Sequence, residues 1–300
     1  MEMPSQRPGR LKVGVVGAGR VGTVLAAALQ RAGHPVAAAS AVSSRPRAEA
    51  ILPGVPFLAP QEVVGAADLV LLTVPDDELA GLAAGIVAAG VPVQGKLFAH
   101  ASGRHGAGVL DPLTREGGLP LALHPVMTFT GRPDDLARLA GISFGVTAPG
   151  PLRPIAEALV FEMGAEPVWI EEENRTLYHA ALAAGANHLV TLVVEASGLL
   201  GKAGVAEPGR MLGPLLGAAL DNALRLGGQG LTGPVARGDA GTVADHVAAL
   251  AKAEPDAIAA YLALARRTAD LALDAGLLKP EDAERLLGAL SDPRRTEGPR

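Results

Sequence analysis

A glycine-rich turn near the N-terminus constrains the fold more than any other feature of the sequence. Six consecutive residues form it, Gly17-Ala18-Gly19-Arg20-Val21-Gly22. The turn follows a β-branched run at residues 11–16 and opens a helical pattern that extends to Ala32. In such a strand–turn–helix unit the first glycine permits the tight turn, the second lets the backbone approach a pyrophosphate, and the third lets helix and strand pack closely. The phosphates lie at the positive helix N-terminus, so we interpret the six residues as a dinucleotide-binding turn in preference to a turn without a ligand.

Short apolar runs alternate with helical patterns along the first half of the chain. The runs predict strands at residues 36–41, 68–74, 96–100, 119–123, 142–147 and 167–170. Strands that alternate with helices form right-handed βαβ units and a mainly parallel sheet. From residue 171 onward only helical patterns occur, at residues 172–203, 208–227, 240–253, 256–275 and 280–290. We expect an α/β Rossmann domain at residues 10–170, an all-α domain at 171–290 and a disordered tail at 291–300.

Composition limits the classes of partner. The 300 residues are 49% hydrophobic and 3% aromatic, with a formal net charge of −5 and both signs interspersed. This leaves no basic footprint for nucleic acid or a membrane surface, so a small molecule is the expected partner. The absence of cysteine excludes disulfides, thiol nucleophiles and cysteine-ligated metals, and we expect a cytoplasmic protein without a metal site. The most apolar stretch, residues 180–200, contains Asn187, His188 and Glu195, which favours a buried helix over a membrane span.

The end of the second strand indicates the cofactor preference. Turns that bind NAD place a carboxylate about 20 residues after the glycines, where it binds the ribose 2′-hydroxyl. Between His34 and Glu49 this sequence has no carboxylate and instead offers Ser43, Ser44 and Arg45. Hydroxyl groups and a guanidinium suit a 2′-phosphate dianion, so we expect NADP(H). The alternative is that these are ordinary solvated loop residues.

Polar residues follow three of the predicted strands at their carboxyl ends, where open parallel sheets bind ligands. Val74-Pro75-Asp76 ends one strand, Ser102 follows a second and His124 ends a third. We expect the nicotinamide beside Val74, Pro75 and Ser102, and the substrate beside His124. For His124, a catalytic role and a structural role with the ring satisfied by backbone groups are equally compatible with the sequence. Ser102 either touches the substrate or caps a turn.

Three more polar residues stand out in the helical part. His179 and Asn187 lie eight residues apart, near one face of the long helix. Buried histidine and asparagine side chains need partners, so these two either satisfy each other and the backbone or face a cleft. Arg237 lies in a turn-rich loop, where it either pairs with Asp239 or holds a substrate carboxylate with its guanidinium.

The order of these motifs resembles the Rossmann-like proteins that carry the domain of unknown function 2520. The motifs are the glycine turn, His100-x-Ser102-Gly103, His124-Pro125, Tyr178-His179 to Asn187, and Leu231-Thr232-Gly233-Pro234-x-x-Arg237-Gly238-Asp239 to His246. The resemblance covers nearly the whole chain between residues 11 and 290, and the Leu-Thr-Gly-Pro loop is its most specific part. It implies an NADP-type Rossmann domain joined to a helical domain similar to that of 6-phosphogluconate dehydrogenase, pyrroline-5-carboxylate reductase and ketopantoate reductase.

The wider superfamily implies roles by position. In prephenate and arogenate dehydrogenases a serine after a strand and the histidine of a His-Pro step handle the substrate hydroxyl, and by position Ser102 and His124 resemble these. Hydroxyacid dehydrogenases and ketopantoate reductases use a lysine on the first helix of the second domain. Here Arg175 and His179 stand at the early part of that helix. A histidine must replace the lysine if the protein is an enzyme.

These observations predict an NADP(H)-dependent oxidoreductase for a small carboxylate-bearing carbonyl, imine or alcohol, with ketopantoate-type 2-oxo acid reduction favoured. His124 or His179 then exchanges the proton, Ser102 and Asn187 orient the reacting oxygen, and Arg237 holds the carboxylate. A pyrroline-5-carboxylate-like imine reductase and a non-catalytic NADP(H)-binding sensor or scaffold are the alternatives. The long helix is apolar around most of its surface, and with the resemblance this predicts a homodimer built on the second domain.

Overall fold

The computed structural model describes residues 9–42 and 44–291. Ser43 and residues 292–300 of the expected tail lie outside the described residues. The chain divides into two compact units, residues 1–185 and 186–300, and each is described by itself. The expected domain boundary at residue 170 coincides with the end of the sheet, whereas the division between the units falls later, inside the long helix.

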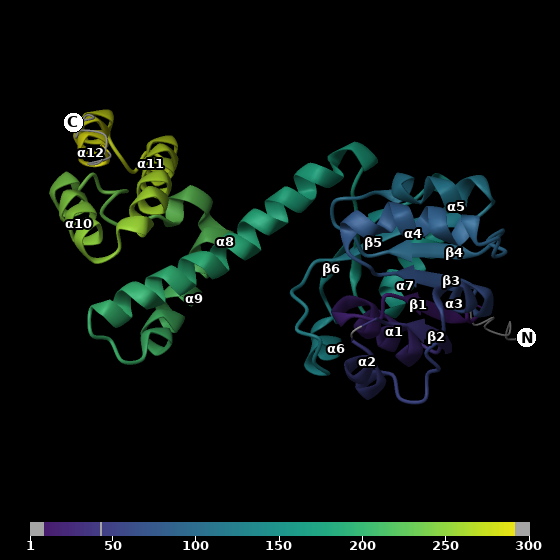
Figure 1. Ribbon diagram of the computed structural model, residues 1–300. Helices are drawn as coiled ribbons and strands as arrows, with labels where there is room; N and C mark the ends of the chain where they lie inside the picture. The colour runs from purple at the N-terminus through teal and green to yellow at the C-terminus, as the bar shows by residue number, and fades with distance from the viewer. Residues whose placement is uncertain (1–8, 43, 292–300) are drawn as a thin grey trace, which may run out of the picture. The chain divides into compact units, whose positions relative to one another are not determined.

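A seven-stranded sheet forms the centre of the first unit (Figure 1), with strand order β2-β1-β3-β4-β5-β6-β7. The strands are β1 (Val13–Val16), β2 (Val36–Ser40), β3 (Leu69–Leu72), β4 (Leu97–His100), β5 (Leu119–Pro125), β6 (Ser143–Thr147) and β7 (Glu166–Trp169). Neighbouring strands run parallel except β5 and β6, which are antiparallel. β1, β3 and β4 are buried along their whole length, as strands covered on both faces are. The predicted fold class, a mainly parallel α/β domain followed by a helical region, is confirmed.

Helices cover both faces of the sheet, and Figure 1 shows α4 and α5 on one side with α1 and α2 on the other. The helices of this unit are α1 (Arg20–Arg31), α2 (Arg45–Ile51), α3 (Pro60–Ala66), α4 (Asp76–Ala88), α5 (Asp111–Arg115), α6 (Asp134–Arg138) and α7 (Arg153–Glu162). One apolar core includes side chains of α1, α2 and α7, and a second includes those of α3, α4 and α5. Because β1, β3 and β4 are parallel, the turns that follow them meet at one edge of the sheet.

The second unit is helical. Its helices are the later part of α8 (Arg175–Lys202), α9 (Pro208–Leu226), α10 (Ala240–Ala253), α11 (Ile258–Asp274) and α12 (Pro280–Ala289). The core of this unit lies among α10, α11 and α12, where Val243, Leu262 and Leu286 are buried. By contrast, the only buried residue of α9 is Leu212, and the only one of α8 is Arg175, at its beginning. Most of the core of the unit therefore comes from its last three helices.

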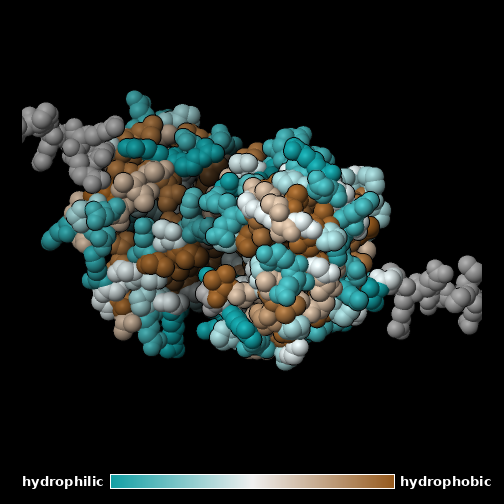
Figure 2. Space-filling view, turned by 45° about the vertical axis from the view of Figure 1, so that its right-hand side comes forward, coloured by the Kyte–Doolittle hydropathy of each residue, from teal (hydrophilic) through white to brown (hydrophobic). Residues whose placement is uncertain are grey.

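The long helices α8 and α9 carry exposed apolar side chains. Figure 2 shows apolar residues at the surface of the helical unit. The exposed ones are Leu189, Val190, Leu192 and Val194 on α8, and Met211, Leu215, Leu220, Leu224 and Leu226 on α9. By length and composition alone, Glu172–Lys202 would also suffice to cross a membrane, a weak indication because core helices of soluble proteins meet the same criterion. Large exposed apolar surfaces mark interaction sites, and we propose that a second copy of the chain covers these two helices.

We expect the protein to form a homodimer, and sedimentation over a range of concentrations measures this. Leu224 is 79% exposed. Leu224→Glu should weaken the dimer, because the interface would bury a carboxylate without a partner. Phe161 of α7 is a matched control, since it is apolar and 59% exposed but belongs to the first unit, and Phe161→Glu should leave the dimer intact. A wild-type protein that sediments as a monomer in dilute solution would contradict this assembly.

Candidate functional site

Two glycines of the predicted turn are required by close contacts with the end of β3. Gly17 has a φ of +92°, and a Cβ there would lie 2.9 Å from the backbone of Thr73. A Cβ at Gly22 would lie 2.1 Å from Thr73 Oγ1. The Thr73 hydroxyl donates to the Gly17 carbonyl at 2.8 Å. The turn and the beginning of α1 are thus held against the carboxyl end of β3.

The second glycine has open space above it. A Cβ at Gly19 would meet nothing nearer than the Gly17 carbonyl oxygen at 3.8 Å. Gly19 is also the N-cap of α1 and supplies no side-chain cap, so the first N–H groups of this twelve-residue helix are available to a ligand. Space and free N–H donors at a helix N-terminus fit the pyrophosphate of a dinucleotide. Gly17 and Gly22 thus lie in close contacts and Gly19 in open space, and the binding of a pyrophosphate at Gly19 stays a prediction.

The loop after β2 carries the residues expected to bind the 2′-phosphate. The Ser44 hydroxyl donates to the Ala18 carbonyl at 2.7 Å, so its proton holds this loop to the glycine turn. Arg45 pairs with Glu49 at 2.8 Å and lies over the ring of Phe57 at 5.1 Å. Its side chain is 59% exposed, which leaves it accessible to an anion. Ser43 lies outside the described residues.

Two further arginines approach the same region. A Cβ at Gly131 would lie 2.8 Å from Arg20 Cγ and 2.8 Å from Arg47 Cδ, so both side chains pack against this glycine. The loop that contains Gly131 is fastened by the buried carboxylate of Asp135, which accepts hydrogen bonds from the backbone N–H groups of Thr130 and Gly131 at 2.8 and 2.7 Å. Arg47 therefore joins Arg20 beside the turn, a proximity that the sequence did not reveal.

A small cavity of about 130 Å³ opens at the carboxyl ends of β3 and β4. Its lining consists of Val21, Leu72, Thr73, Val74, Asp76, Leu79, Ala101 and Ser102. The structure thus brings together two residues that were expected beside the nicotinamide, Val74 and Ser102, and adds Val21 of the glycine turn, while Pro75 is exposed and does not line the cavity. Asp76, at the beginning of α4, places a carboxylate in the cavity wall, and in the described part of the chain it forms no ion pair.

His100 holds the loop that carries Ser102. The buried imidazole bonds the Gly106 carbonyl through Nε2 at 2.8 Å, and its Nδ1 accepts from the Ser102 N–H at 3.2 Å. Burial lowers the pKa of His100 to about 4, so the ring is neutral at physiological pH. The Ser102 hydroxyl oxygen accepts from the His105 N–H at 3.2 Å. No hydrogen bond among the described residues uses the hydroxyl proton, which leaves it available to a ligand in the cavity.

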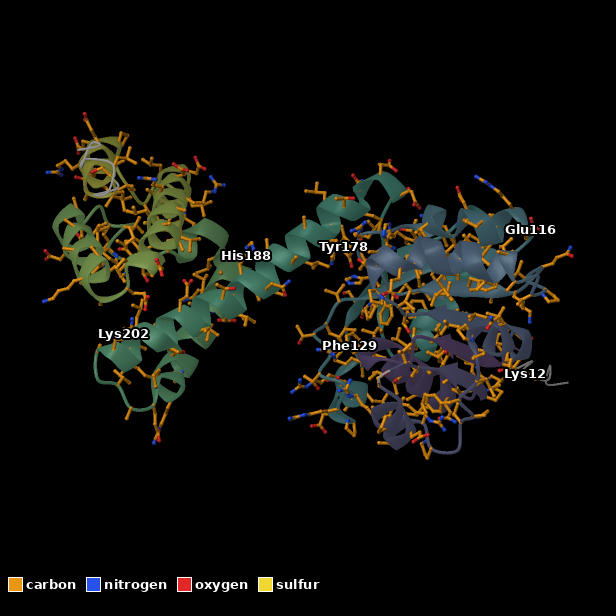
Figure 3. The ribbon with its side chains drawn as sticks, viewed as in Figure 1. Lys12, Glu116, Phe129, Tyr178, His188 and Lys202 are labelled. Atoms are coloured by element: carbon orange, nitrogen blue, oxygen red, sulfur yellow. The ribbon has the colours of Figure 1, made fainter. Side chains whose placement is uncertain are left out.

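A second polar cluster combines the end of β5 with the beginning of α8, where Figure 3 labels Tyr178. His124 Nδ1 lies 2.8 Å from the Tyr178 hydroxyl, and the rings of His124 and His179 meet edge to face at 6.0 Å. Two glycines make room for this cluster. A Cβ at Gly103 would lie 3.0 Å from His124 Nε2 and 2.6 Å from His179, and a Cβ at Gly145 would lie 2.3 Å from the Tyr178 hydroxyl. The Nε2 side of His124 therefore faces the loop of Ser102 and Gly103.

The protonation state of His124 differs from the expectation. Sequence reasoning chose a histidine because its ordinary pKa lies near neutrality. Burial, together with the nearby His179 and Arg175, lowers the pKa of His124 to about 4. At pH 7 the free protein therefore holds a neutral imidazole here, which can donate or accept a hydrogen bond but does not begin as an imidazolium acid.

Arg175 lies beneath this cluster and is 1% exposed. Its Nε donates to Thr147 Oγ1 at 2.7 Å, and one terminal nitrogen donates to the carbonyls of Gly145 and Ala122 at 3.0 and 3.3 Å. The other terminal nitrogen, Nη1, is buried without a hydrogen-bond partner. No carboxylate of the described residues forms an ion pair with this guanidinium. Arg175 therefore anchors α8 to the sheet and places near His124 a positive charge that Glu172 stabilises only without direct contact.

Glu172 joins the two loops of the site. Its carboxylate accepts from the backbone N–H groups of Ala107 and Gly108 at 2.9 and 3.1 Å. A Cβ at Gly106 would lie 2.2 Å from this carboxylate, so the contact depends on that glycine. Glu172 thereby fixes the start of the segment that carries Tyr178 and His179 against the loop that follows Ser102.

Asn187 and Arg237 belong to the second unit. Asn187 is exposed. The Arg237 guanidinium donates to Asp239 Oδ2 at 3.0 and 2.7 Å and to the Thr232 carbonyl at 2.5 Å. The ion-pair alternative for Arg237 is therefore present, and the catalytic roles of both residues stay predictions.

Sequence reasoning gave no functional role to Tyr178, Asp76 or the buried charge of Arg175. One signal was available for Tyr178, since it is one of only two tyrosines in the chain and stands beside His179. Asp76 was placed with Val74-Pro75 at a strand end but was not assigned to the binding of cofactor or substrate. The burial of Arg175 has no local signal, because it results from β6 pairing with β5.

Replacing Gly19 and Gly22 with Ala should separate binding from folding. Gly22→Ala should lower the free energy of unfolding by about 1–3 kcal/mol, because its Cβ overlaps Thr73. Gly19→Ala should unfold like the wild type but lose most of its NADPH affinity, because its Cβ fills the space for the pyrophosphate. Thermal unfolding and NADPH titration measure the two effects. Unchanged NADPH affinity in Gly19→Ala would contradict the assignment.

Comparisons with known proteins agree with this architecture. A Rossmann-like domain model matches residues 1–125, and a model of the domain of unknown function 2520 matches residues 142–268. The comparison with curated proteins gave no match. Among solved structures, a candidate NADP oxidoreductase from Bacteroides fragilis is similar with a TM-score of 0.71 and 23% identity, over 87% of this chain and 98% of the other.

Two enzymes of known activity share the fold at lower identity. Plasmodium falciparum pyrroline carboxylate reductase with NADP bound has a TM-score of 0.57 and 12% identity, over 93% of this chain and all of the other (100%). A Pseudomonas imine reductase has a TM-score of 0.57 and 18% identity, over 94% of this chain and 93% of the other. At these identities the likeness shows the fold. The two family models together span most of the chain, which contains a Rossmann-like domain followed by the domain of unknown function 2520.

Proposed function

We propose that the protein is an NADP(H)-dependent reductase of the C=N bond of a small, carboxylate-bearing imine. The observation that carries this proposal is the cavity at the strand ends, which combines an unpaired carboxylate, Asp76, with the hydroxyl group of Ser102 beside the dinucleotide turn. Ligands of open α/β sheets bind at this edge. When bound, NADPH would supply a hydride to the substrate carbon.

The charges of the site favour an iminium over a ketone. An iminium is cationic, and the Asp76 carboxylate attracts it, whereas a neutral carbonyl gains little from that carboxylate. His124 and His100 are neutral at pH 7, since their pKa values are about 4, and so do not repel a cation. The ketopantoate-type substrate favoured from the sequence has no support among the similar structures described above, whereas two of those proteins are named for reactions of imines.

The chain's own polar groups have distinct roles in this proposal. Ser102 offers its free hydroxyl proton to the substrate nitrogen. Nε2 of His124 faces the loop that carries Ser102. His179 packs against His124 and orients its ring. Asn187 and Arg237 keep their predicted roles in orienting the reacting atom and holding the substrate carboxylate. The Arg237 guanidinium forms an ion pair with Asp239, so a substrate carboxylate would have to share that guanidinium with Asp239.

Arg20, Arg45 and Arg47 support NADP(H) over NAD(H), because guanidinium groups suit the additional phosphate. Arg45→Ala should weaken NADPH binding by about tenfold, as expected for a lost charge-assisted hydrogen bond. NADH binding should hardly change. Arg115→Ala removes an exposed arginine of α5 and should change neither affinity. Equal losses for both cofactors in Arg45→Ala would remove Arg45 from the 2′-phosphate site.

A matched substrate panel tests the reaction. Cyclic imines that carry a carboxylate should cause NADPH oxidation, and 2-oxo acids of similar size should not. Asp76→Asn should raise KM for the imine by about tenfold or more, because a charge-assisted contact is lost. Turnover of the oxo acids but not of the imines would overturn the substrate class. NADPH binding without oxidation across the panel would favour the sensor alternative.

A further inference from the structure

Arg175 is buried with an incompletely satisfied guanidinium, since its Nη1 lacks a hydrogen bond. Among the described residues no carboxylate forms an ion pair with it, and Glu172 stabilises its charge only without direct contact. Tyr178, on the same helix turn, is able to become an anion, and its ring centre lies 5.7 Å from Arg175 Cζ. A tyrosinate at this position would further neutralise the buried charge. The guanidinium therefore favours the tyrosinate, in opposition to burial, which raises the pKa of Tyr178.

The partner for that proton is in place. The Tyr178 hydroxyl lies 2.8 Å from His124 Nδ1, and the opposite ring nitrogen, Nε2, faces the loop of Ser102. An imidazole that accepts a proton at one nitrogen while it releases one from the other stays neutral throughout. The space for this arrangement depends on Gly145 on β6 and Gly103 after β4, two glycines that come from different parts of the sheet.

We propose that Tyr178 is the proton source of the proposed reaction and acts through His124, with Arg175 stabilising the tyrosinate that results. The Tyr178 O–H bond breaks as an N–H bond forms at His124 Nδ1, and the Nε2–H bond breaks as an N–H bond forms on the substrate. The substrate binds as the neutral imine, and the relay proton converts it to the iminium, which Asp76 stabilises. The hydride that NADPH would supply then converts the iminium C=N to CH–NH. Tyr178 is a positioning residue in this scheme, since it does not touch the substrate. The inference rests on the proposed function.

Opposing influences set the acidity of Tyr178. Burial, the largest of them, raises its pKa, while Arg175 and a backbone hydrogen bond with Gly145 lower it. Arg175 therefore reduces the free-energy cost of forming the tyrosinate. Tyr178 also lines an open groove of about 310 Å³ with Trp169 and Leu177, through which water can return the proton.

The pH dependence follows from the groups that surround His124. His179 and Arg175 on α8 disfavour its protonation, and Asp76 on α4 favours it, with burial as the largest influence. Protonation of His124 would occupy Nδ1 and break the relay. Because the pKa of His124 is about 4, activity should be lost only as the pH falls toward that value. Between pH 6 and 8 the protonation of His124 should not affect activity.

The direction of the Tyr178–His124 hydrogen bond is measurable without a substrate. Nitrogen NMR of histidine-labelled protein should show His124 neutral at pH 7, protonated at Nε2 and accepting a hydrogen bond at Nδ1. Tyr178→Phe should abolish the hydrogen-bond signature at Nδ1. Tyr261→Phe is a matched control, because Tyr261 bonds His246 Nδ1 in the second unit at 3.0 Å, and it should leave His124 unchanged. A proton on Nδ1 of His124 would overturn the relay, since Tyr178 would then be the acceptor.

The chain has only two tyrosines, so carbon NMR of labelled tyrosine follows each of them separately. Arg175→Gln should move the ionisation of Tyr178 to higher pH and leave that of Tyr261 in place. An unchanged Tyr178 ionisation would overturn the role of Arg175. If Arg175→Gln fails to fold, Tyr178→Phe still decides the relay, because it keeps the ring and removes only the hydroxyl.

Turnover provides the kinetic test. Tyr178→Phe should lower kcat by about 10²-fold, the lower end for a positioned proton donor, and leave NADPH affinity unchanged. When kcat is measured in mixtures of light and heavy water, its dependence on the deuterium fraction should indicate two protons transferred in the rate-limiting step of the wild type. The same measurement on Tyr178→Phe should indicate one. A kcat within twofold of the wild type would overturn the relay. Absence of turnover in the wild type would instead contradict the proposed function, whereas the NMR measurements judge the relay independently.

Discussion

The contact of Gly22 with Thr73 determines how the rest of the site is built. No side chain fits between the start of α1 and the end of β3, because a Cβ at Gly22 would lie 2.1 Å from Thr73 Oγ1. This approach aligns the N-terminus of α1 with the residues that follow β3, among them Val74 and Asp76. The strand order then brings Ser102, which follows β4, to the same edge. One steric requirement thus positions the N-terminus of α1, where we propose that the pyrophosphate binds, and the cavity beside it.

Charge is distributed unevenly around that cavity. His100 and His124 are neutral, and among the described residues neither Asp76 in the cavity wall nor the buried Arg175 forms an ion pair. In a low-dielectric environment such imbalances influence which ligand charges bind and which groups ionise. Asp76 favours a cationic iminium, and Arg175 favours an anion at Tyr178. Both effects suit the reduction of an imine, which becomes a cation when the relay proton reaches its nitrogen.

The parts predicted from the sequence are those with local signals. The glycine turn and the strands follow from spacing along a few residues, and Val74, Ser102 and His124 follow from the rule that ligands bind at strand ends. Tyr178 and Arg175 were not predicted as a functional pair, because their positions depend on the antiparallel pairing of β5 with β6, which places Gly145 beneath the Tyr178 hydroxyl. The pKa of His124 also required the fold, since burial is its main cause.

A crystal structure of the protein with NADPH tests the central claim most directly, because the claim assigns each part of the cofactor to a place. The pyrophosphate should lie over Gly19 at the N-terminus of α1, and the nicotinamide should occupy the cavity between Val74 and Ser102 with Asp76 in its wall. A cofactor whose nicotinamide lies outside this cavity, or whose phosphates bind away from Gly19, would contradict the account.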